Sequence, residues 1–364
     1  EGTTYLRHLE LHDVRLFVEA CLDVVPDATT VLTGPNGSGK TTLLEAVAYL
    51  GSQRSFRTSA RDAMVRTGAD RAIVRGGLER ESRPLLVESE LSATGGTRTL
   101  VNHHVVSHRV ALADAVPFTV FSPEDLGLVQ GPPARRRELV DAALRLVDPR
   151  AAAELDAMDR VLRQRAALLR QAGGRLSADV VSSLDVWDER LCTSGNAVSD
   201  ARRALVEHAA PLVASAYDGL AVSNGRPADV SMAYTPGWQG ELAAALGASR
   251  RDDVRRAVST AGPHRDEVLL AIDRREARTR ASQGEQRSLA LALRLGLHRL
   301  VTARRGGAPL LLLDDVFSEL DPERSRALVR QLPPGQALLT TAAALPAGVA
   351  VGTMVDVRTA GRRG

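Results

Sequence analysis

The chain has 364 residues, of which 44% are hydrophobic, 25% are charged and only 3% are aromatic, a composition typical of globular proteins. Its formal net charge is +3, so a strongly basic surface requires local clusters of cations. No apolar run is long enough to span a bilayer and no secretory leader is recognised, so no membrane association is expected. Cys21 and Cys192 have no C-x-x-C partner, which argues against a disulfide framework or a zinc site and fits a reducing cytoplasm.

The first third of the chain predicts strands around a phosphate-binding loop. Alternating apolar residues predict two strands over residues 5–23, and residues 29–33 form a short apolar strand. Residues 34–41 read GPNGSGKT, which matches the G-x-x-x-x-G-K-T pattern, and a helix is expected to follow over residues 41–50. Lys40 is the only lysine among 47 lysines and arginines. A slim ammonium group fits between the β- and γ-phosphates of a nucleotide, where a planar guanidinium group would not.

This loop predicts a site for ATP and Mg²⁺. The backbone N–H groups and the N-terminus of the helix surround the β-phosphate, Lys40 adds positive charge, and Thr41 places its hydroxyl on Mg²⁺. The residues expected to bind ATP are Gly34, Pro35, Asn36, Gly37, Ser38, Gly39, Lys40, Thr41 and Thr42.

The middle of the chain predicts a hairpin, a strand and then helices. Residues 71–90 are expected to form a β-hairpin and residues 117–121 a strand, and residues 138–146 are amphipathic. Apolar residues then recur every seven positions on both sides of a Gly173-Gly174 turn, which predicts an antiparallel helical hairpin. Polar residues occupy some of the other positions that would face the partner helix, and Pro211 breaks the pattern, so we expect a short packed arm. The polar positions are Arg165, Ser194 and His208.

The last third returns to strands and contains an acidic strand end. Strands are expected over residues 229–234, 309–314 and 336–340, and a long helix over residues 282–304. The strand at 309–314 ends in Asp314 and Asp315. Asp314 is expected to hold Mg²⁺ together with Thr41. Asp315 is expected to be the general base that orients the attacking water, and it is grouped as catalytic with Lys40.

Residues 282–285 have two interpretations. Ser282 followed by Glu285 is a capping box at the start of a helix. The same four residues, Ser282, Gln283, Gly284 and Glu285, resemble the signature motif of ABC-type ATPases, which in that superfamily binds the γ-phosphate of a nucleotide held by a second subunit. The resemblance implies that Ser282 is catalytic, that the other three contact ATP, and that ATP joins two chains head to tail.

Residues 318–321 also have two interpretations. Ser318, Glu319 and Asp321 resemble the dimer-interface loop of the same superfamily. Asp321 followed by Pro322 is otherwise a helix start, with aspartate as the cap and proline at the first helical position.

The spacing of these motifs selects one family. A mostly helical insert fills the 242 residues from Lys40 to Ser282, more than a transporter ATPase carries and less than the coiled coils of chromosome-maintenance or zinc-hook repair ATPases. Several short motifs, in order, resemble the RecF family of bacterial recombination mediators. They are residues 5–9 and 14–17, RSFRT at 54–58, FSPEDL at 121–126, GPP at 131–133, RRR at 135–137, GPHRD at 262–266, LDDV at 313–316 and SELD at 318–321.

The resemblance implies an α/β fold with two lobes. Residues 5–122 and 262–364 are expected to form an ABC-type ATPase lobe with a mixed sheet, and residues 123–261 a mostly helical lobe with the short hairpin. It also implies an ATP-dependent dimer that binds duplex DNA and ssDNA–dsDNA junctions and helps RecO and RecR to load RecA. Arg15 and Arg57 fall where related ATPases place nucleotide-contacting arginines.

Three positions depart from the general ABC pattern. Asp315 replaces the usual glutamate and is one methylene shorter, which implies slow hydrolysis. Thr340 and Thr341 stand where a switch histidine usually follows the strand. Thr119 lies near the position expected for the Q-loop glutamine.

Arginine clusters suggest where DNA binds. Residues 54–80 hold seven arginines against three acids, and residues 98–109 hold two arginines, three histidines and no acid. Both clusters, like residues 132–175, are also consistent with solvated surfaces, and for 132–175 that interpretation is preferred. The candidate DNA contacts are Arg54, Arg61, Arg66, Arg98 and Arg109. Two other functions stay open: an energising subunit of a membrane transporter, and a scaffold that binds ATP without hydrolysing it.

Overall fold

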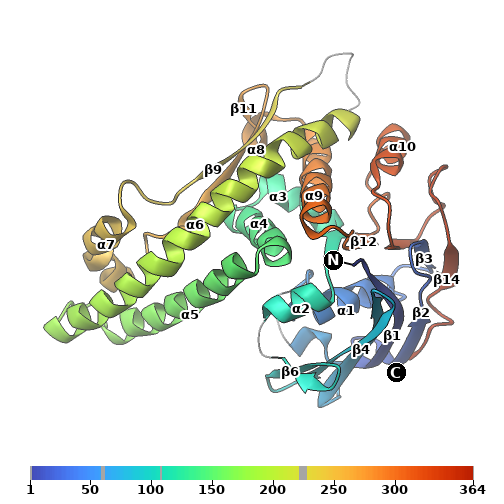
Figure 1. Ribbon diagram of the computed structural model, residues 1–364, viewed down its shortest axis with the longest axis horizontal. Helices are drawn as coiled ribbons and strands as arrows, with labels where there is room; N and C mark the ends of the chain where they lie inside the picture. The colour runs from blue at the N-terminus through green and yellow to red at the C-terminus, as the bar shows by residue number, and fades with distance from the viewer. Residues whose placement is uncertain (1, 59–61, 107–108, 221–227, 364) are drawn as a thin grey trace. The chain divides into compact units, whose positions relative to one another are not determined.

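A computed structural model describes residues 2–58, 62–106, 109–220 and 228–363 of the chain. The described residues divide into two compact units. Unit 1 comprises those within 2–125, 215–220 and 291–363, and unit 2 those within 126–214 and 228–290 (Figure 1).

Unit 1 contains an antiparallel sheet in the order β15-β2-β1-β4-β5-β6-β7. Buried and accessible residues alternate along its long strands, as the sequence predicts. Asn102 and His103 both have positive φ angles at the tight turn between β6 and β7. The strands are β1 (Thr4–Val14), β2 (Phe17–Asp23), β4 (Arg71–Arg80), β5 (Arg83–Ser92), β6 (Thr97–Val101), β7 (His104–Val105) and β15 (Gly361–Arg363).

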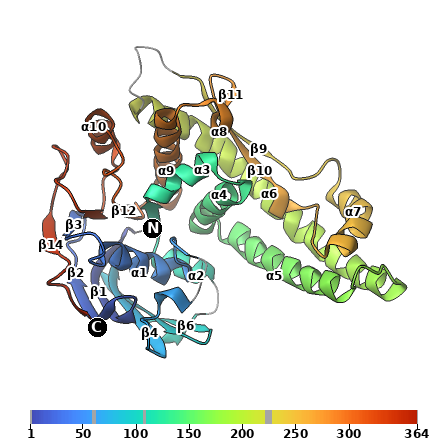
Figure 2. The ribbon, with the colours of Figure 1, turned by 180° about the vertical axis from the view of Figure 1, so that it is seen from behind.

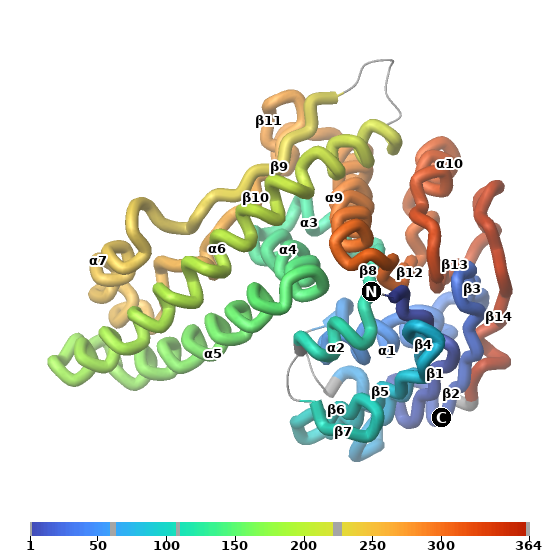
Figure 3. Tube along the Cα trace, in the orientation of Figure 1, coloured from blue at the N-terminus to red at the C-terminus, as the bar shows by residue number. Residues whose placement is uncertain are grey.

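A second, all-parallel sheet of unit 1 has the order β14-β3-β13-β12-β8. Figure 3 follows these strands as a row from β8 to β14. Because they are parallel, their carboxyl ends lie at one edge, where ligands bind in open α/β sheets. The strands are β3 (Thr29–Thr33), β8 (Phe118–Phe121), β12 (Leu310–Asp314), β13 (Ala337–Thr341) and β14 (Thr353–Asp356).

Helix α1 (Lys40–Ser52) packs against both sheets, and 11 of its 13 residues are buried. Leu43, Leu44 and Leu50 belong to one core with Leu9 of β1 and Leu312 of β12. Burial on all sides explains why α1 is apolar around most of its circumference. The mixed α/β lobe is therefore confirmed, with its strands divided between two sheets. Unit 1 also contains α2 (Arg109–Ala115), α10 (Pro322–Gln331) and the C-terminal part of α9 (Gln283–Arg305).

Unit 2 is mostly helical. Helices α5 and α6 run side by side as the predicted hairpin, and Gly173 and Gly174 turn with positive φ angles (Figures 1 and 2). A small antiparallel sheet has the order β11-β10-β9. The elements are α3 (Leu126–Gln130), α4 (Pro133–Val147), α5 (Pro149–Gln171), α6 (Ala178–Leu220), β9 (Val230–Thr235), α7 (Leu242–Arg256), β10 (Glu267–Ile272), β11 (Arg275–Glu276) and α8 (Ala277–Arg280).

Two features of unit 2 differ from the sequence-based expectation. Helix α6 continues through Pro211, because fully buried Ala209 and Val213 hold it on either side of the missing backbone hydrogen bond. Unit 2 also extends to Ala290 instead of ending at residue 261, because β10 pairs along its whole length with β9.

The helical arm contains a buried ion-pair network around Arg165. Its side chain is fully buried, and its Nε donates to Asp188 Oδ1 at 2.8 Å. Its Nη1 donates to Ser259 Oγ at 2.7 Å and lies 2.8 Å from Asp253 Oδ2, which is also fully buried. The polar position that weakens the seven-residue pattern therefore joins α5, α6 and α7 through charge.

We predict that Arg165→Met destabilises the protein by about 3–5 kcal/mol, because it leaves the buried carboxylate of Asp253 without its countercharge. Arg255→Met is the matched control, since it removes an exposed arginine from an ion pair with Asp252 on the same helix as Asp253. The control should cost less than about 1 kcal/mol. Urea unfolding of both variants measures the difference, and equal losses would contradict the prediction.

His298 of α9 is buried in unit 1, and its Nδ1 lies 3.2 Å from Thr119 Oγ1. Burial is the main reason that its pKa falls from 6.5 to about 4, and the charge of Arg299 adds to the effect. In the unfolded chain His298 binds a proton as the pH falls through about 6.5, whereas in the folded chain it stays neutral down to about pH 4. His298 therefore costs stability progressively as the pH falls through this window, by about 3 kcal/mol in total.

His298→Leu should accordingly reduce the loss of unfolding free energy between pH 7 and pH 4.5 relative to the wild type. The same substitution at exposed His104 should leave that loss almost unchanged. Denaturant titrations at the two pH values test this, and parallel pH profiles for wild type and His298→Leu would show the explanation to be wrong.

Candidate nucleotide-binding and catalytic site

The phosphate-binding loop connects the carboxyl end of β3 to the first turn of α1. Gly34, Gly37 and Gly39 have positive φ angles, and a Cβ atom at Gly39 would lie 2.5 Å from the ring of Phe17. Glycine is therefore required there by both conformation and space. Lys40 is 7% exposed, and its Nζ donates to the carbonyl oxygens of Gly34 (2.7 Å) and Pro35 (3.0 Å). The loop thus encloses its ammonium group.

The structure brings Thr41 and Asp314 together, as predicted. Thr41 Oγ1 donates to Asp314 Oδ1 at 2.8 Å, although 273 residues separate them. Thr340 Oγ1 donates to the same oxygen at 2.8 Å. Burial is the main reason that the pKa of Asp314 is raised, and the nearby charge of Glu124 adds to the effect.

Asp315 follows the end of β12 in a left-handed conformation, with φ 47°. Its backbone N–H donates to Thr340 Oγ1 at 2.9 Å, so one threonine hydroxyl fixes both consecutive aspartates. Few residues other than glycine adopt this conformation, but aspartate is among those that tolerate it, so the turn suits the residue present. The hydroxyl at the switch position thus has a structural role that sequence reasoning missed. The basis of this structural role is the parallel register, which places Thr340 of β13 opposite Asp314 of β12.

We expect Thr340→Val to destabilise unit 1 by roughly 1–3 kcal/mol, because it leaves the N–H of Asp315 without a partner and removes one of the two hydroxyls that donate to Asp314, at nearly constant volume. Thr340→Ser keeps the hydroxyl and should cost less. Chemical unfolding of the two variants compares them directly. A serine variant as unstable as the valine variant would indicate that packing, and not the hydrogen bonds, is responsible.

Arg15 and Arg57 converge on one carboxylate of α1. Arg15 donates twice to Glu45, from Nε at 2.6 Å and from Nη2 at 2.5 Å, and Arg57 Nη1 lies 3.8 Å from the same side chain. The charge of Arg57 also lowers the pKa of Asp314 as a smaller contribution against burial. Glu45 was assigned no role from sequence.

The carboxyl edge of β8 holds residues 122–125, next to the end of β12. Asp125 shapes this turn by accepting from the N–H of Ser122 and from the guanidinium group of Arg294. Thr119, near the position expected for the Q-loop glutamine, pairs with Leu311 inside the sheet, and its Oγ1 lies 3.2 Å from His298 Nδ1.

Ser282–Glu285 lies in unit 2, and its local geometry is that of a capping box. Ser282 N donates to Glu285 Oε2 at 2.7 Å, and Glu285 N donates to Ser282 Oγ at 3.3 Å. Ser282, Gln283 and Glu285 are exposed at the start of α9, while Gly284 is partly buried. The following Gln286 is buried and donates to the carbonyl oxygens of Ala277 and Arg278. An exposed, capped helix N-terminus results, which suits an anion.

The turn at residues 318–321 caps α10. Asp321 accepts from the N–H groups of Glu323 (3.0 Å) and Arg324 (2.8 Å), and these hydrogen bonds lower its pKa. Ser318 Oγ donates to the carbonyl oxygen of Asp315 at 2.8 Å, and Glu319 is exposed. The helix-start interpretation is confirmed, and the role at a dimer interface stays a prediction.

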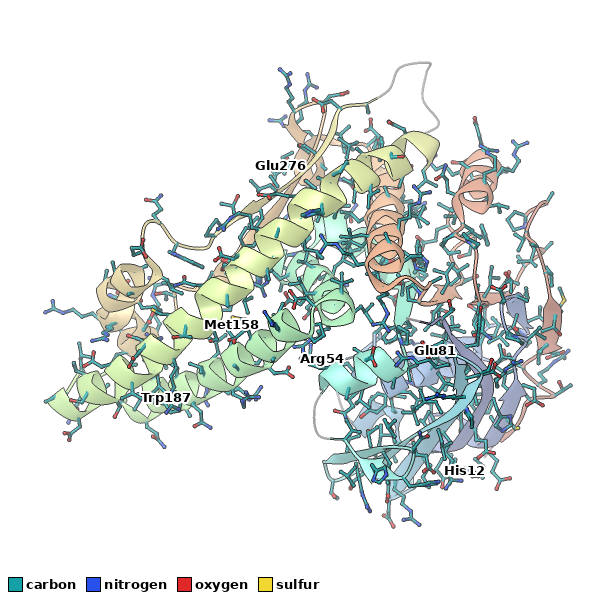
Figure 4. All side chains as sticks on the ribbon, in the orientation of Figure 1. His12, Arg54, Glu81, Met158, Trp187 and Glu276 are labelled. Atoms are coloured by element: carbon teal, nitrogen blue, oxygen red, sulfur yellow. The ribbon has the colours of Figure 1, made fainter. Side chains whose placement is uncertain are left out.

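The candidate DNA contacts are not equivalent. Arg54 is exposed directly after α1 (Figure 4), and Arg98 is exposed on β6 opposite Glu90. Arg66 donates to Asp13 at 2.7 Å, so its charge is partly neutralised. Arg109 begins α2, and Arg61 lies outside the described residues.

Two neighbouring arginines of the first cluster, Arg71 and Arg75, also pair with carboxylates across the β4–β5 hairpin. The cluster at residues 54–80 is therefore less basic than its arginine count indicates.

A glycine-rich loop leading from β3 into a helix, with a buried aspartate at the end of β12 in the same parallel sheet, defines an ATPase-type head of the P-loop class. The RecF/RecN/SMC N-terminal domain matches residues 5–339. The DNA replication and repair protein RecF of Streptomyces avermitilis is 38% identical over 372 residues, covering 97% of this chain and 98% of that protein. RecF of Frankia alni is 40% identical and covers 93% of both. The chain therefore belongs to the RecF family, as the motifs indicated.

Solved structures have the same fold. The recombination mediator RecF bound to ATP, from the RecFOR pathway, matches with a TM-score of 0.85 at 24% identity and covers 94% of this chain and 93% of that chain. The Smc head domain of Pyrococcus furiosus matches with a TM-score of 0.54 at 14% identity over 94% of this chain and 90% of that chain. Among the described residues no helix is long and apolar enough to cross a membrane.

Proposed function

We propose that this protein is an ATP-dependent, DNA-binding recombination mediator with a slow ATPase activity. The observation that carries the proposal is the contact between Thr41 and Asp314 beside the enclosed Lys40, in a chain that belongs to the RecF family. The related solved structure is described as a recombination mediator and contains ATP, which supports ATP as the substrate.

Thr41 and Asp314 fit a magnesium ion. A hydroxyl and a carboxylate oxygen 2.8 Å apart are hard oxygen donors at one point of the site. Among the described residues no group of three or more His, Cys, Asp or Glu side chains could hold a metal, which suits an ion whose remaining ligands are phosphate oxygens and water. When bound, Mg²⁺ would neutralise the charge that develops on the phosphates.

Hydrolysis is assigned to Asp315. Its carboxylate would accept a proton from the water that attacks the γ-phosphorus, while the bond to the β–γ bridging oxygen breaks and ADP leaves. Lys40 would stabilise the negative charge on the phosphates. Because Asp315 is shorter than glutamate, we expect slow ATP hydrolysis. The rate of hydrolysis would then set how long the ATP-bound state lasts.

The site is proposed to need a second chain. The exposed helix N-terminus at Ser282, with Gln283, Gly284 and Glu285, would bind the γ-phosphate held by a partner copy. Ser318, Glu319 and Asp321 would line the same dimer interface. DNA duplexes and ssDNA–dsDNA junctions would bind through arginines, with Arg54 and Arg98 as the exposed described candidates.

The partners follow from the family. RecO and RecR are proposed as partners because the related structure belongs to the RecFOR pathway, and RecA loading at gaps is the proposed outcome. We place this activity at the nucleoid, in the cytoplasm.

We predict that ATP converts the wild type from monomer to dimer in gel filtration with light scattering, and that junction DNA enhances the conversion. Ser282→Arg should remain monomeric because a bulky cation replaces the proposed phosphate donor. Lys40→Met should bind no ATP, and Asp315→Ala should dimerise but release phosphate roughly 100-fold more slowly. A wild type that is monomeric under every nucleotide condition contradicts the mechanism, and dimerisation without phosphate release favours the scaffold.

A further inference from the structure

Glu45 is a fully buried carboxylate next to the candidate site. It lies on α1 four residues after Thr41, so the two side chains are on the same face of the helix. A buried charge is costly unless it is paired and hydrogen-bonded, so its partners are expected to be specific.

Arg15 supplies the countercharge. Its Nε and Nη2 donate to the two oxygens of Glu45 at 2.6 and 2.5 Å, a bidentate pair with little freedom. Arg15 has a φ of 50° in the turn between β1 and β2, and its backbone N–H donates to Met64 O at 2.9 Å. The guanidinium group of Arg15 is therefore held in place by both backbone and carboxylate.

Ser55 connects Glu45 to the segment that carries Arg57. The hydroxyl of Ser55 donates to Glu45 Oε1. The same hydroxyl accepts from the N–H groups of Arg57 (3.0 Å) and Thr58 (3.1 Å). One buried carboxylate thus sets the backbone of residues 55–58 relative to the helix of the phosphate-binding loop.

Arg57 is bound to this cluster more loosely than Arg15. Its Nη1 is 3.8 Å from Glu45 Oε2, and its side chain is 41% exposed. Its guanidinium group is also close enough to Asp314 for the two charges to interact. The exposed side chain of Arg57 can reorient toward a bound anion without breaking a bidentate ion pair.

We propose that Glu45 is a positioning residue for ATP binding: it fixes Arg15 and, through Ser55, holds Arg57 beside the phosphate-binding loop. This inference rests on the proposed function, because it needs ATP to bind at that loop. It assigns the direct phosphate contact to Arg57 and an indirect effect to Glu45 and Ser55.

The test measures ATP affinity by equilibrium titration for the wild type, Glu45→Gln, Ser55→Ala, Arg57→Gln and the double variant of Glu45 and Arg57. We expect Glu45→Gln to weaken ATP binding about tenfold, the size of one lost charge-assisted hydrogen bond, and Ser55→Ala to weaken it about threefold. The double variant should bind no more weakly than Arg57→Gln alone, because Glu45 acts through Arg57.

Glu88→Gln is the matched control, since it removes a carboxylate from a 2.7 Å contact with Arg75 Nε on the β4–β5 hairpin. It should bind ATP like the wild type. Urea unfolding of every variant separates lost positioning from lost folding. If Glu45→Gln does not fold, Ser55→Ala decides, because it leaves the ion pair with Arg15 in place.

Two outcomes overturn the inference alone: wild-type ATP affinity in folded Glu45→Gln or Ser55→Ala, and losses at Glu45 and Arg57 that simply add. A wild type that binds no ATP, or a Lys40→Met variant that binds as well as the wild type, overturns the proposed function and this inference with it.

Discussion

The candidate site depends on the buried carboxylate of Asp314, which accepts hydroxyl donors from two other elements. Thr41 donates from the first turn of α1 and Thr340 donates from β13, both at 2.8 Å. These bonds join the phosphate-binding loop to β12 and β13, which the sequence separates by more than 250 residues. Thr340 also accepts from the N–H of Asp315, so the proposed metal ligand and the proposed base are fixed by the same hydroxyl. Because Asp314 is buried, each of these partners offsets part of the cost of removing its charge from water.

Arginine has a different task in each unit. In unit 2, Arg165 and Arg202 are buried and each pairs with two carboxylates, so they join the elements that carry those carboxylates. In unit 1, Arg15 is fixed by Glu45, whereas Arg57 remains partly exposed. Counting arginines in the sequence therefore says little about how much positive charge a surface offers. What matters is how many of them already have a carboxylate within reach, as Arg66, Arg71 and Arg75 do.

Sequence reasoning located the elements whose pattern is local. The strand at 29–33 has the predicted bounds and the acidic strand begins one residue after its predicted start, because each shows an uninterrupted apolar pattern with clear ends. The seven-residue repeat predicted the two helices of the arm without giving their bounds. The contact between Thr41 and Asp314 was also predictable, because both belong to recognised motifs. The burial and ion pairing of Glu45 could not be predicted, because its partner Arg15 lies 30 residues upstream and nothing in the helix pattern marks position 45 as buried. The expected interruption at Pro211 was wrong because buried residues on both sides of it hold α6 together, although proline disfavours helix.

The enclosed side chain of Lys40 has a practical consequence. It carries the only lysine ammonium group of the sequence, and the phosphate-binding loop leaves it 7% exposed. Among the side chains of this sequence, therefore, only Lys40 offers a primary amine to acylating reagents. The extent of acylation at Lys40 is a direct chemical measure of access to the loop, obtainable by peptide mass analysis without introducing any label or mutation.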